Sequence, residues 1–412
     1  MGIFSRKKKT ENPQNSLSSS PLFRSNMTAA GVFISETNAM RTAAVYACVR
    51  VLAEAVASLP LNIYRRVDDG QKVAYDHNLQ RILHNEPNPK MTSFVFRETL
   101  MSHLLLWGNA YAQIIRDGGG RVRALYPLAP DRISVNCDET GNTYYTYWYG
   151  ANERRGQDGG NQVILRDYEV MHIPGLSYDG LIGYSTIDLA RSAIGMAVAT
   201  ENYGASFFAN GAVPSGVLEH TGSIRDEQAV REAWNKLHQG TGRGNNTAIL
   251  EDGMTYHVVS TAPEQAQFLE TRKFQIDEIC RIFRVPPHMI ADLEKSSFSN
   301  IEQQSLEFVK FSLDPWITRW EQSMYQSLLL PSEKDDYFIK FNLDGLLRGD
   351  YETRMKGYSI GIQNGIMSPN DIRRLENMNL IPAEEGGDNY IVNGNMTKLR
   401  DVGAAYAKSD NM

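Results

Sequence analysis

The chain has 412 residues, of which 42% are hydrophobic and 22% charged, and its formal net charge is −6. This composition predicts a globular protein with room for two or more packed units. Proteins that grip nucleic acid tightly usually carry a basic excess, because neutralised phosphates supply the affinity. The acidic balance argues against a tight nucleic-acid binder, so any contact with DNA is expected to be loose.

Cysteine spacing and the absence of long apolar runs argue against further classes. Cys48, Cys137 and Cys280 are far apart and show no C-x-x-C spacing, so neither a zinc site nor a disulfide framework is expected. A membrane-spanning helix needs about 18 consecutive apolar residues, and no apolar run in the sequence approaches that length. The basic start MGIFSRKKK lacks a following apolar segment, so a secretion signal is not expected. Gly2 would permit myristoylation, but a flexible basic tail is the preferred interpretation.

The first half of the chain reads as a disordered arm followed by mixed helices and strands. Residues 1–35 are rich in Ser, Asn, Lys and Pro, which is typical of disorder. Helical spacing of apolar residues, alternation and breakers predict the elements that follow. Helices are expected over 37–59, 77–84 and 93–107, and strands over 61–66, 109–117, 122–128, 143–150 and 163–173.

Two long helices then flank a small insertion. The first, 185–208, places Ile187, Ala190, Ile194, Ala197 and Val198 on one face. The second, 263–283, places Leu269, Ile276, Cys280 and Phe283 on one face, and Pro286-Pro287 ends it. The insertion between them is expected to contain strands at 216–220, 247–251 and 255–260, a helix at 225–240 and a glycine-rich turn at 241–246.

A polar loop, 291–300, leads into a third long helix over 301–330. Pro315 removes one backbone hydrogen bond there and predicts a kink. A buried stripe is expected along its second half, formed by Leu313, Ile317, Trp320, Met324 and Leu328, so Trp320 and its neighbour Trp316 are assigned to the core. A strand at 337–343 and helices at 350–361 and 370–376 follow, the last with Ser368 as N-cap, and the chain is expected to be loose from about 383.

No catalytic constellation accompanies these elements. The chain has no G-x-x-x-x-G-K-[ST], no H-E-x-x-H and no G-x-S-x-G, and the glycine-rich run 240–244 follows a helix, which favours a plain turn. His172 is interpreted as a partly buried strand residue, and His288 as a residue that packs or caps. The carboxylate pairs Asp277-Glu278 and Glu302/Glu307 are interpreted as solvated or intersubunit charges. No enzymatic activity, metal or cofactor is therefore expected.

Four runs of the sequence, taken together, resemble one known family. They cover residues 44–66, 104–133, 172–187 and 284–322, and they lie in the same order as in the portal proteins of HK97-type tailed phages. The resemblance spans about 38–395. It implies an α+β portal fold in a ring of twelve identical subunits at one capsid vertex, with a central channel for double-stranded DNA.

The resemblance also implies a division of the chain into parts of the portal. A portal subunit of this family comprises a mixed α/β wing, a helical stem, a small α/β clip and a long kinked tunnel helix. The expected bounds are a basic arm at 1–35, the wing at 36–184, stem helices at 185–210 and 263–285, the clip at 211–262, the tunnel loop at 286–300, the tunnel helix at 301–330, a C-terminal wing or crown at 331–395 and a flexible tail at 396–412.

Candidate contact residues follow from this division. In the tunnel loop, the small or polar residues Lys295, Ser296, Ser297, Ser299 and Asn300 are expected to face the DNA channel. Lys295 could instead be solvated or contact a neighbouring subunit. In the clip, the candidate contacts are Lys236, His238, Arg243 and Asn245, first to the packaging motor (the terminase large subunit) and later to the head–tail connector. The major capsid protein or a scaffold is a further expected partner, and the expected location is the virion, with assembly in the host cytoplasm and no membrane contact.

Two other classes stay open at this point. Another non-catalytic ring or adaptor of the virion, such as a connector or baseplate component, would share the lack of catalytic motifs, but it would not need a loop in a DNA-width channel. A metal-dependent nuclease would need carboxylates converging on Mg²⁺, with Glu302 and Glu307 as the candidates, and no D/E-x-K-like cluster on a strand supports it.

Overall fold

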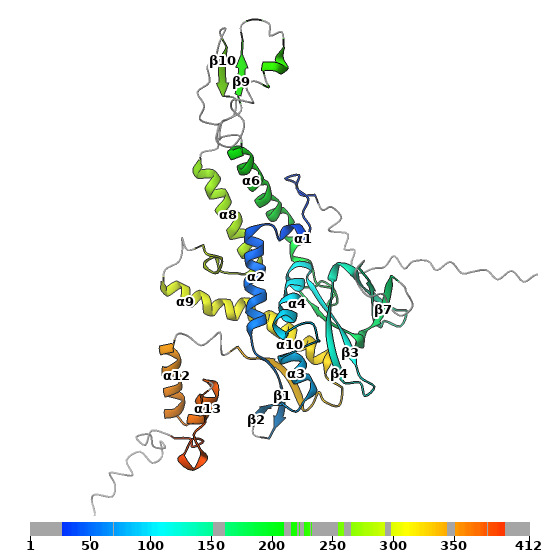
Figure 1. Ribbon diagram of the computed structural model, residues 1–412, viewed down its shortest axis with the longest axis vertical. Coiled ribbons are helices and arrows are strands. Elements are labelled where there is room, and N and C mark those ends of the chain that lie inside the picture. The colour runs from blue at the N-terminus through cyan, green and yellow to red at the C-terminus, as the bar shows by residue number, and fades with distance from the viewer. Residues whose placement is uncertain are drawn as a thin grey trace, which may run out of the picture. The chain divides into compact units, whose positions relative to one another are not determined.

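The structure is a computed structural model that describes residues 27–68, 70–150, 161–209, 216–220, 222, 226–230, 232, 254–258, 265–292, 298–343, 351–376 and 378–391 (Figure 1). The chain divides into two compact units, Met1–Asn342 and Leu343–Met412. Helices and antiparallel strands follow one another along the first unit, which makes the fold α+β, as expected from the sequence.

The helices of the first unit are α1 (Glu36–Ala39), α2 (Ala43–Ser58), α3 (Asn78–His84), α4 (Ser93–Trp107), α5 (Thr186–Leu189), α6 (Arg191–Ala209), α8 (Gln265–Phe283), α9 (Phe298–Glu307) and α10 (Asp314–Leu328). Its strands are β1 (Leu61–Val67), β2 (Gly70–Val73), β3 (Asn109–Arg116), β4 (Val122–Leu128), β5 (Ile133–Cys137), β6 (Thr143–Trp148), β7 (Gln162–Arg166), β8 (Val170–Pro174), β9 (Gly216–Glu219), β10 (Thr255–Val258) and β11 (Tyr337–Phe341).

The described strands form small antiparallel sheets. Their orders are β11-β1-β2, β4-β3-β8, β5-β6-β7 and β10-β9. In the first of these, Leu61 pairs with Phe341 and Arg65 with Tyr337, so the end of the first unit returns to pair with a strand near its beginning. This closure fixes the segment that follows α10 onto the N-terminal half of the unit.

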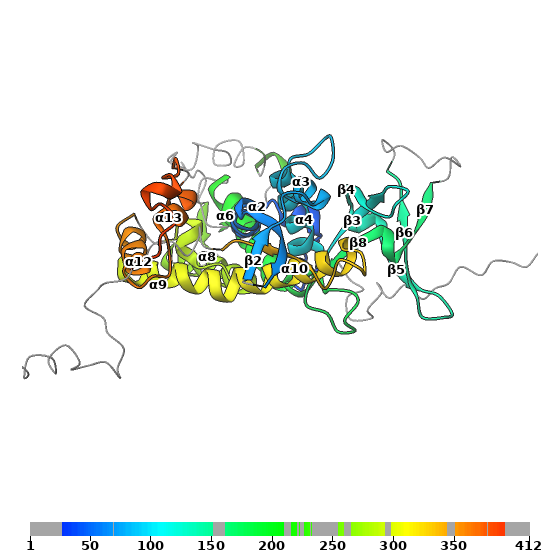
Figure 2. The ribbon, with the colours of Figure 1, turned by 90° about the horizontal axis from the view of Figure 1, so that it is seen from below.

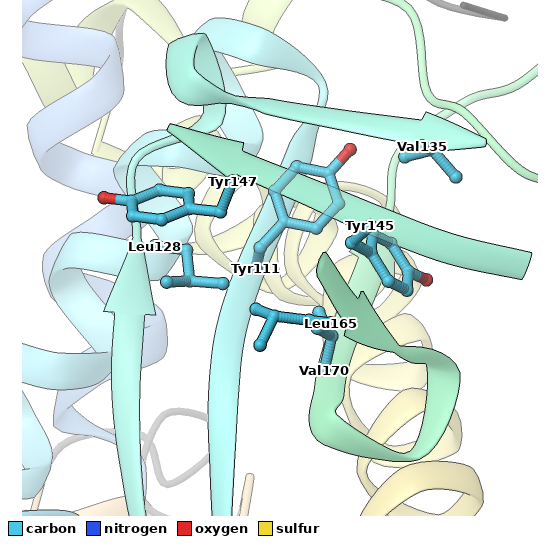
Figure 3. Packing of buried hydrophobic residues seen from close by; sticks show 7 residues of the cluster. All are labelled: Tyr111, Leu128, Val135, Tyr145, Tyr147, Leu165 and Val170. Carbon is cyan, nitrogen blue, oxygen red and sulfur yellow. The ribbon is translucent and has the colours of Figure 1, made fainter. Parts of the chain in front are cut away.

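A cluster of aromatic and aliphatic side chains joins the sheets β4-β3-β8 and β5-β6-β7 (Figure 3). Tyr111 from β3 meets Tyr145 from β6 edge-on, with ring centroids 6.0 Å apart. Such aromatic pairs bury large apolar areas and prefer this geometry. The buried members of the cluster are Tyr111, Leu128, Val135, Tyr145, Tyr147, Leu165 and Val170.

Helix α2 lies at the centre of the helical part of this unit. It packs against α4 and α8, and Val45, Val49, Leu52 and Val56 are fully buried along it. Cys48 of α2 and Cys280 of α8 are buried as free thiols that interact with each other. The absence of C-x-x-C spacing gave no hint of this long-range pairing.

Helices α6 and α8 lie side by side (Figure 1). Gly204 of α6 faces the ring of Phe268, and a Cβ at this position would lie 2.6 Å from its Cζ atom. The glycine therefore sets how closely the two helices approach. Of this helix pair, expected from the sequence at 185–208 and 263–283, the second has nearly the expected bounds, whereas the first begins only at Arg191.

Three predicted segments are divided in the structure. The helix expected over 37–59 is interrupted because Thr42 is extended (φ −75°, ψ 119°) and begins α2 anew. The helix expected over 185–208 breaks at Ala190 (φ −89°, ψ 2°) between α5 and α6. The strand expected over 163–173 becomes β7 and β8, which a 3₁₀ turn separates and which belong to different sheets.

Part of the segment expected to be a disordered arm is folded. Met27 and Phe33 form a β-bridge across a turn at Gly31, whose φ of +71° suits glycine. Ile34 is fully buried, and the Thr28 side chain lies against Gly195 of α6. Burial of Ile34 and this close contact give residues 27–35 a packed position that composition alone does not indicate.

The second unit contains α12 (Tyr351–Gln363) and α13 (Pro369–Leu375). Ser368 caps α13 through a capping box with Asp371, as the Ser-Pro sequence predicted. Asn370 is buried, and its Nδ2 donates to the carbonyl of Ile381 and to Asp388. This side chain holds residues 381–388 against α13, although their composition suggested a loose segment.

Candidate functional site

The turn that leaves α8 has an unusual backbone. Arg284 and Ala291 both have positive φ, 55° and 70°, and a 3₁₀ turn, Pro287–Ile290, lies between them. The left-handed region costs about 1 kcal/mol or more for a residue with a Cβ. Such a conformation persists only where surrounding contacts enforce it.

Two side-chain contacts enforce this turn. Ser312 donates its hydroxyl proton to the carbonyl oxygen of Arg284. His288 Nδ1 lies 2.8 Å from Gln304 Oε1, which ties the 3₁₀ turn to α9. His288 thus packs and bonds at the turn, as its position after two prolines predicted. The chain is held on both sides of residues 293–297.

Helix α9 continues through a π-helical turn, Phe308–Leu313, into α10 (Figure 2). The N–H of Asp314 bonds to the carbonyl of Val309, five residues earlier. Pro315 follows at once; it has no N–H, and in a regular helix its ring would collide with the carbonyl four residues before it. The π turn accommodates the proline, so the irregularity expected here takes the form of a wider turn.

The second half of this long helix is anchored in the core. Ile317, Trp320, Met324 and Leu328 are fully buried, which confirms the predicted stripe, and Trp320 meets Phe341 of β11 edge-on at 6.3 Å. The first half differs, because Leu306 and Phe311 are about half exposed. The long helix is therefore fixed at α10 and presents apolar side chains around α9 and the π turn.

The candidate channel and clip residues are only partly described. Ser299 and Asn300 lie in the first turn of α9, where the structure describes the backbone. The remaining candidates lie outside the described residues: Lys295, Ser296 and Ser297 of the tunnel loop and Lys236, His238, Arg243 and Asn245 of the clip. The channel and clip assignments therefore stay predictions.

A second site of close contact joins two of the sequence runs quoted above. We call Gly108, Asn109, Gly175 and Gly183 the glycine–asparagine clamp. The N–H of Gly175 donates to the carbonyl of Gly108 at 2.8 Å. The Asn109 side chain donates to the carbonyl of Gly183 and accepts from its N–H, both at 2.8 Å. The clamp fixes the segment after β8 to the junction of α4 and β3.

Only glycine fits two positions of the clamp. A Cβ at Gly183 would lie far inside the van der Waals contact distance of the Gly108 carbonyl oxygen. A Cβ at Gly108 would meet the backbone carbonyl of Tyr184 in the same way, and Gly108 also has a φ of +73° as the C-cap of α4. Because the opposing atoms are backbone, no side-chain rotation can relieve either collision.

His172 of β8 connects the clamp to the aromatic core. Its Nε2 lies 3.0 Å from Asn109 Oδ1 and its Nδ1 lies 3.3 Å from the Tyr145 hydroxyl. The imidazole stacks on Tyr111 with ring centroids 4.4 Å apart. Burial lowers the pKa of His172 to about 3 and that of His103 in α4 to about 4. Both histidines are therefore neutral in the folded protein at physiological pH.

Acid is expected to destabilise the first unit through these two histidines. Below pH 6.5 the unfolded chain binds a proton at His172 and at His103, whereas the folded chain does so only near pH 3–4. Stability should thus be complete above pH 6.5 and fall as the pH drops toward 4, by about 1.4 kcal/mol per pH unit for each group. Glutamine carries one donor group and one acceptor group and does not titrate. Denaturant unfolding of His172→Gln should therefore show a shallower pH dependence than the wild type, and an unchanged slope would contradict this assignment.

The clamp supports a projecting loop, residues 176–182. Asp179 accepts hydrogen bonds from the N–H groups of Leu181 and Ile182 and from the hydroxyl of Ser177, and the backbone bonds lower its pKa. From α10, Arg319 donates to the carbonyl oxygens of Pro174 and Gly175. Two apolar side chains of this ordered loop are exposed: Tyr178 is 89% exposed and Leu176 is 66% exposed.

A cavity of about 730 Å³ lies between this loop, the sheets and α10. Three cationic residues line it. Arg116 donates to the backbone carbonyls of Gly120, Tyr168 and Ser327, Arg319 to those of Pro174 and Gly175, and Lys334 to that of Gln326. His172, also in the lining, is held neutral in the clamp network. These groups are thus engaged in hydrogen bonds that hold the fold.

Within the described residues, no three His, Cys, Asp or Glu side chains lie close enough together to hold a metal ion. In the same part of the chain, none of the helices has the length and apolar character that crossing a membrane requires.

Comparison with known proteins decides the family. The family model "Phage portal protein" matches residues 43–377. The chain belongs to the phage portal protein family. It is 35% identical to the "Probable portal protein" of Streptomyces phage phiC31, over 90% of this chain and 82% of the relative. It is 32% identical to the "Portal protein" of Enterobacteria phage HK97, over 92% of this chain and 88% of the relative.

Solved structures show the same fold. A chain of the virion of the native gene transfer agent (GTA) particle superimposes with a TM-score of 0.55, at 22% identity, over 84% of this chain and 93% of that chain. An HK97 family phage portal protein from Corynebacterium diphtheriae superimposes with a TM-score of 0.53, at 18% identity, over 76% of this chain and 96% of that chain. The portal fold expected from the four sequence runs is thereby confirmed.

The glycine–asparagine clamp was not predicted as a unit. Its members lie in two of the runs that carried the resemblance, 104–133 and 172–187, but their contact spans more than seventy residues of sequence. The signal that could have found it is the glycine spacing at Gly175, Gly180 and Gly183 after a strand, together with Gly108 after a helix.

Proposed function

We propose that this portal protein forms a ring of identical subunits at one vertex of a phage capsid, around a channel through which double-stranded DNA enters and leaves. The observation that carries the proposal is the family match over residues 43–377. A related assembly, the neck of the native GTA particle, was computed with C12 symmetry, which supports a ring of twelve. A heterologous interface that closes on itself produces such a ring.

The channel is assigned to the segment between α8 and α10. The turn after α8 and the start of α9 are pinned by the contacts of Ser312 with Arg284 and of His288 with Gln304. These two contacts fix the chain on both sides of residues 293–297. A segment in contact with moving DNA needs such fixed ends. We assign Lys295, Ser296, Ser297, Ser299 and Asn300 to the channel wall, where short polar groups offer weak, exchangeable contacts to phosphates.

The insertion between α6 and α8 is assigned to the clip, which contacts other components of the virion. Its described core is the antiparallel pair β9–β10, in which Gly216 is opposite Val258 and Glu219 is opposite Thr255. Lys236, His238, Arg243 and Asn245 are the residues proposed to contact the terminase large subunit and later the head–tail connector. The wing is the proposed contact to the major capsid protein or scaffold.

Exposed apolar side chains support subunit contacts in the ring. On the helix pair α6 and α8, four large apolar residues are about half exposed: Met196, Tyr203, Leu269 and Phe274. Apolar side chains gathered on one part of a surface often mark protein interfaces. We assign this helix pair and the loop 176–182 to the faces that neighbouring subunits bury.

Removing the tip of the loop is expected to weaken the ring without unfolding the subunit. Tyr178→Ala deletes a side chain that is 89% exposed, so the unfolding midpoint of the separated chain should stay within error. Aromatic anchors at interfaces contribute about 2 kcal/mol or more. Mass photometry over a dilution series should show dissociation at higher protein concentration than for the matched variant Tyr75→Ala, whose tyrosine is 81% exposed elsewhere on the unit. Equal dissociation curves would contradict a role for the loop.

A non-catalytic role follows from the same proposal, since relatives over most of the chain are named portal proteins. The test of the whole function is a phage or capsid-expression system that lacks this gene. Heads formed without the protein should contain no nuclease-protected DNA, and the chain supplied in trans should restore packaging. Heads that fill normally without it would contradict the proposal.

A further inference from the structure

A small cavity, lined by both polar and apolar side chains, lies where the N-terminus of α2 meets α6 and α8. Its volume is about 90 Å³, and Thr42, Ala43 and Ala44 of α2, Thr200 of α6 and Gln275 of α8 belong to its lining. Helix α2 has sixteen residues, and no acidic side chain lies in its first turn. The positive end of its dipole and its first N–H groups therefore lie beside the cavity without a negative partner from the helix itself.

Two buried side chains at this cavity are left without partners. Thr42 is the N-cap residue of α2, yet its side chain makes no capping hydrogen bond. Thr42 Oγ1 and Gln275 Oε1 are fully buried atoms with no hydrogen-bond partner within the described residues. Thr42 is 7% and Gln275 8% exposed. An unpaired buried polar group costs about 1–3 kcal/mol, so two at one cavity indicate that something polar fills it.

The charged residues at the cavity balance each other. Arg272 of α8 and Glu201 of α6 both belong to the lining, and both are exposed at its edge. Arg272 adds a donor and a positive charge on the side of α8. Glu201 and Ala43, the first residue of α2, are both exposed, so solvent screens the charge of Glu201 as well as the dipole of α2.

We propose that this cavity binds a small oxyanion of the carboxylate or phosphate class. The N–H groups of Ala43 and Ala44, the Thr42 hydroxyl and the Gln275 amide, which can present its Nε2, would donate to the anion, and Arg272 would close the site from the edge. The volume accommodates one such ion or about three water molecules at about 30 Å³ each. The ion is either free in solution or the carboxylate of a side chain from a neighbouring copy.

Isothermal titration with inorganic phosphate tests the site in the full-length protein. The assembled ring and separated subunits are each titrated in chloride buffer of matched ionic strength. A free-ion site binds about one phosphate per chain in both forms. A site that takes a neighbour's carboxylate binds phosphate only in the separated subunits. If phosphate binds to neither form, the proposal is wrong and water fills the cavity.

The Thr42→Val variant tests the site itself, since valine keeps the shape and removes the hydroxyl. It should weaken phosphate binding about tenfold or more, as the loss of a hydrogen bond to a charged group does. Its unfolding midpoint without phosphate should not fall, because Thr42 Oγ1 has no described partner to lose. Gln275→Leu is measured in parallel. If Thr42→Val binds phosphate as tightly as the wild type, the assignment is also wrong. Neither outcome depends on the proposed portal function.

Discussion

A Gly183→Ala variant is expected to lose most of the stability of the first unit. The new Cβ would collide with the backbone carbonyl oxygen of Gly108, and relieving the collision would break the bonds of Asn109 to both backbone groups of Gly183. Losses above about 4 kcal/mol are exceptional and need such a mechanism, in which steric overlap combines with buried unpaired polar groups. Denaturant unfolding of the purified chain measures the loss, and insoluble expression would be its extreme form.

Gly180→Ala is the matched control in the same loop. Gly180 also has a positive φ, +79°, but a Cβ there would meet nothing within 4 Å. Only the left-handed strain remains, about 1–2 kcal/mol. If Gly183→Ala were no less stable than Gly180→Ala, the close approach of residues 108 and 183 would be wrong. The clamp would then not explain the contact between the sequence runs 104–133 and 172–187.

Deleting Lys295–Ser299 is expected to abolish DNA packaging while leaving the ring assembled. The contacts that fix both sides of this segment, Ser312 with Arg284 and His288 with Gln304, lie outside the deletion. The buried stripe of α10 is likewise untouched. Subunit folding and ring formation should therefore persist, whereas four of the five proposed channel residues are removed.

Nuclease-protected DNA recovered from heads measures packaging in this variant. A glycine–serine replacement of the same five residues keeps the chain length and separates loss of the side chains from loss of length. The ring is examined in parallel by negative-stain imaging. Failure of the ring to assemble would show that the segment is structural, and normal packaging by the deletion variant would contradict the channel assignment.

Sequence periodicity predicted those parts of the fold that depend on neighbouring residues. The stripe Ile317, Trp320, Met324 and Leu328 is buried as expected, because residues three and four apart share one face of a helix. The N-cap at Ser368 was found for the same local reason. The helix breaks at Thr42 and Ala190 were missed, since neither residue is a helix breaker and tertiary packing decides their conformation.

Long-range contacts were beyond such reasoning. His172 was expected to be a partly buried strand residue, but its bonds to Asn109 and Tyr145 depend on the pairing of β3 with β8 and on the packing of two sheets. The Cys48–Cys280 contact and the cavity at Thr42 likewise arise where helices distant in sequence meet. The channel and clip residues remain predictions from the family resemblance.

The central claim, a closed ring of identical subunits, is tested most directly by the mass and shape of the assembled protein. Mass photometry with negative-stain imaging is applied to the chain produced alone and together with its capsid protein. Twelve chains of 46.3 kDa should give a ring of roughly 560 kDa with an open centre, located at a single vertex of the capsids. A monomer or an open filament in both preparations, with capsids that lack a ring, would contradict the account.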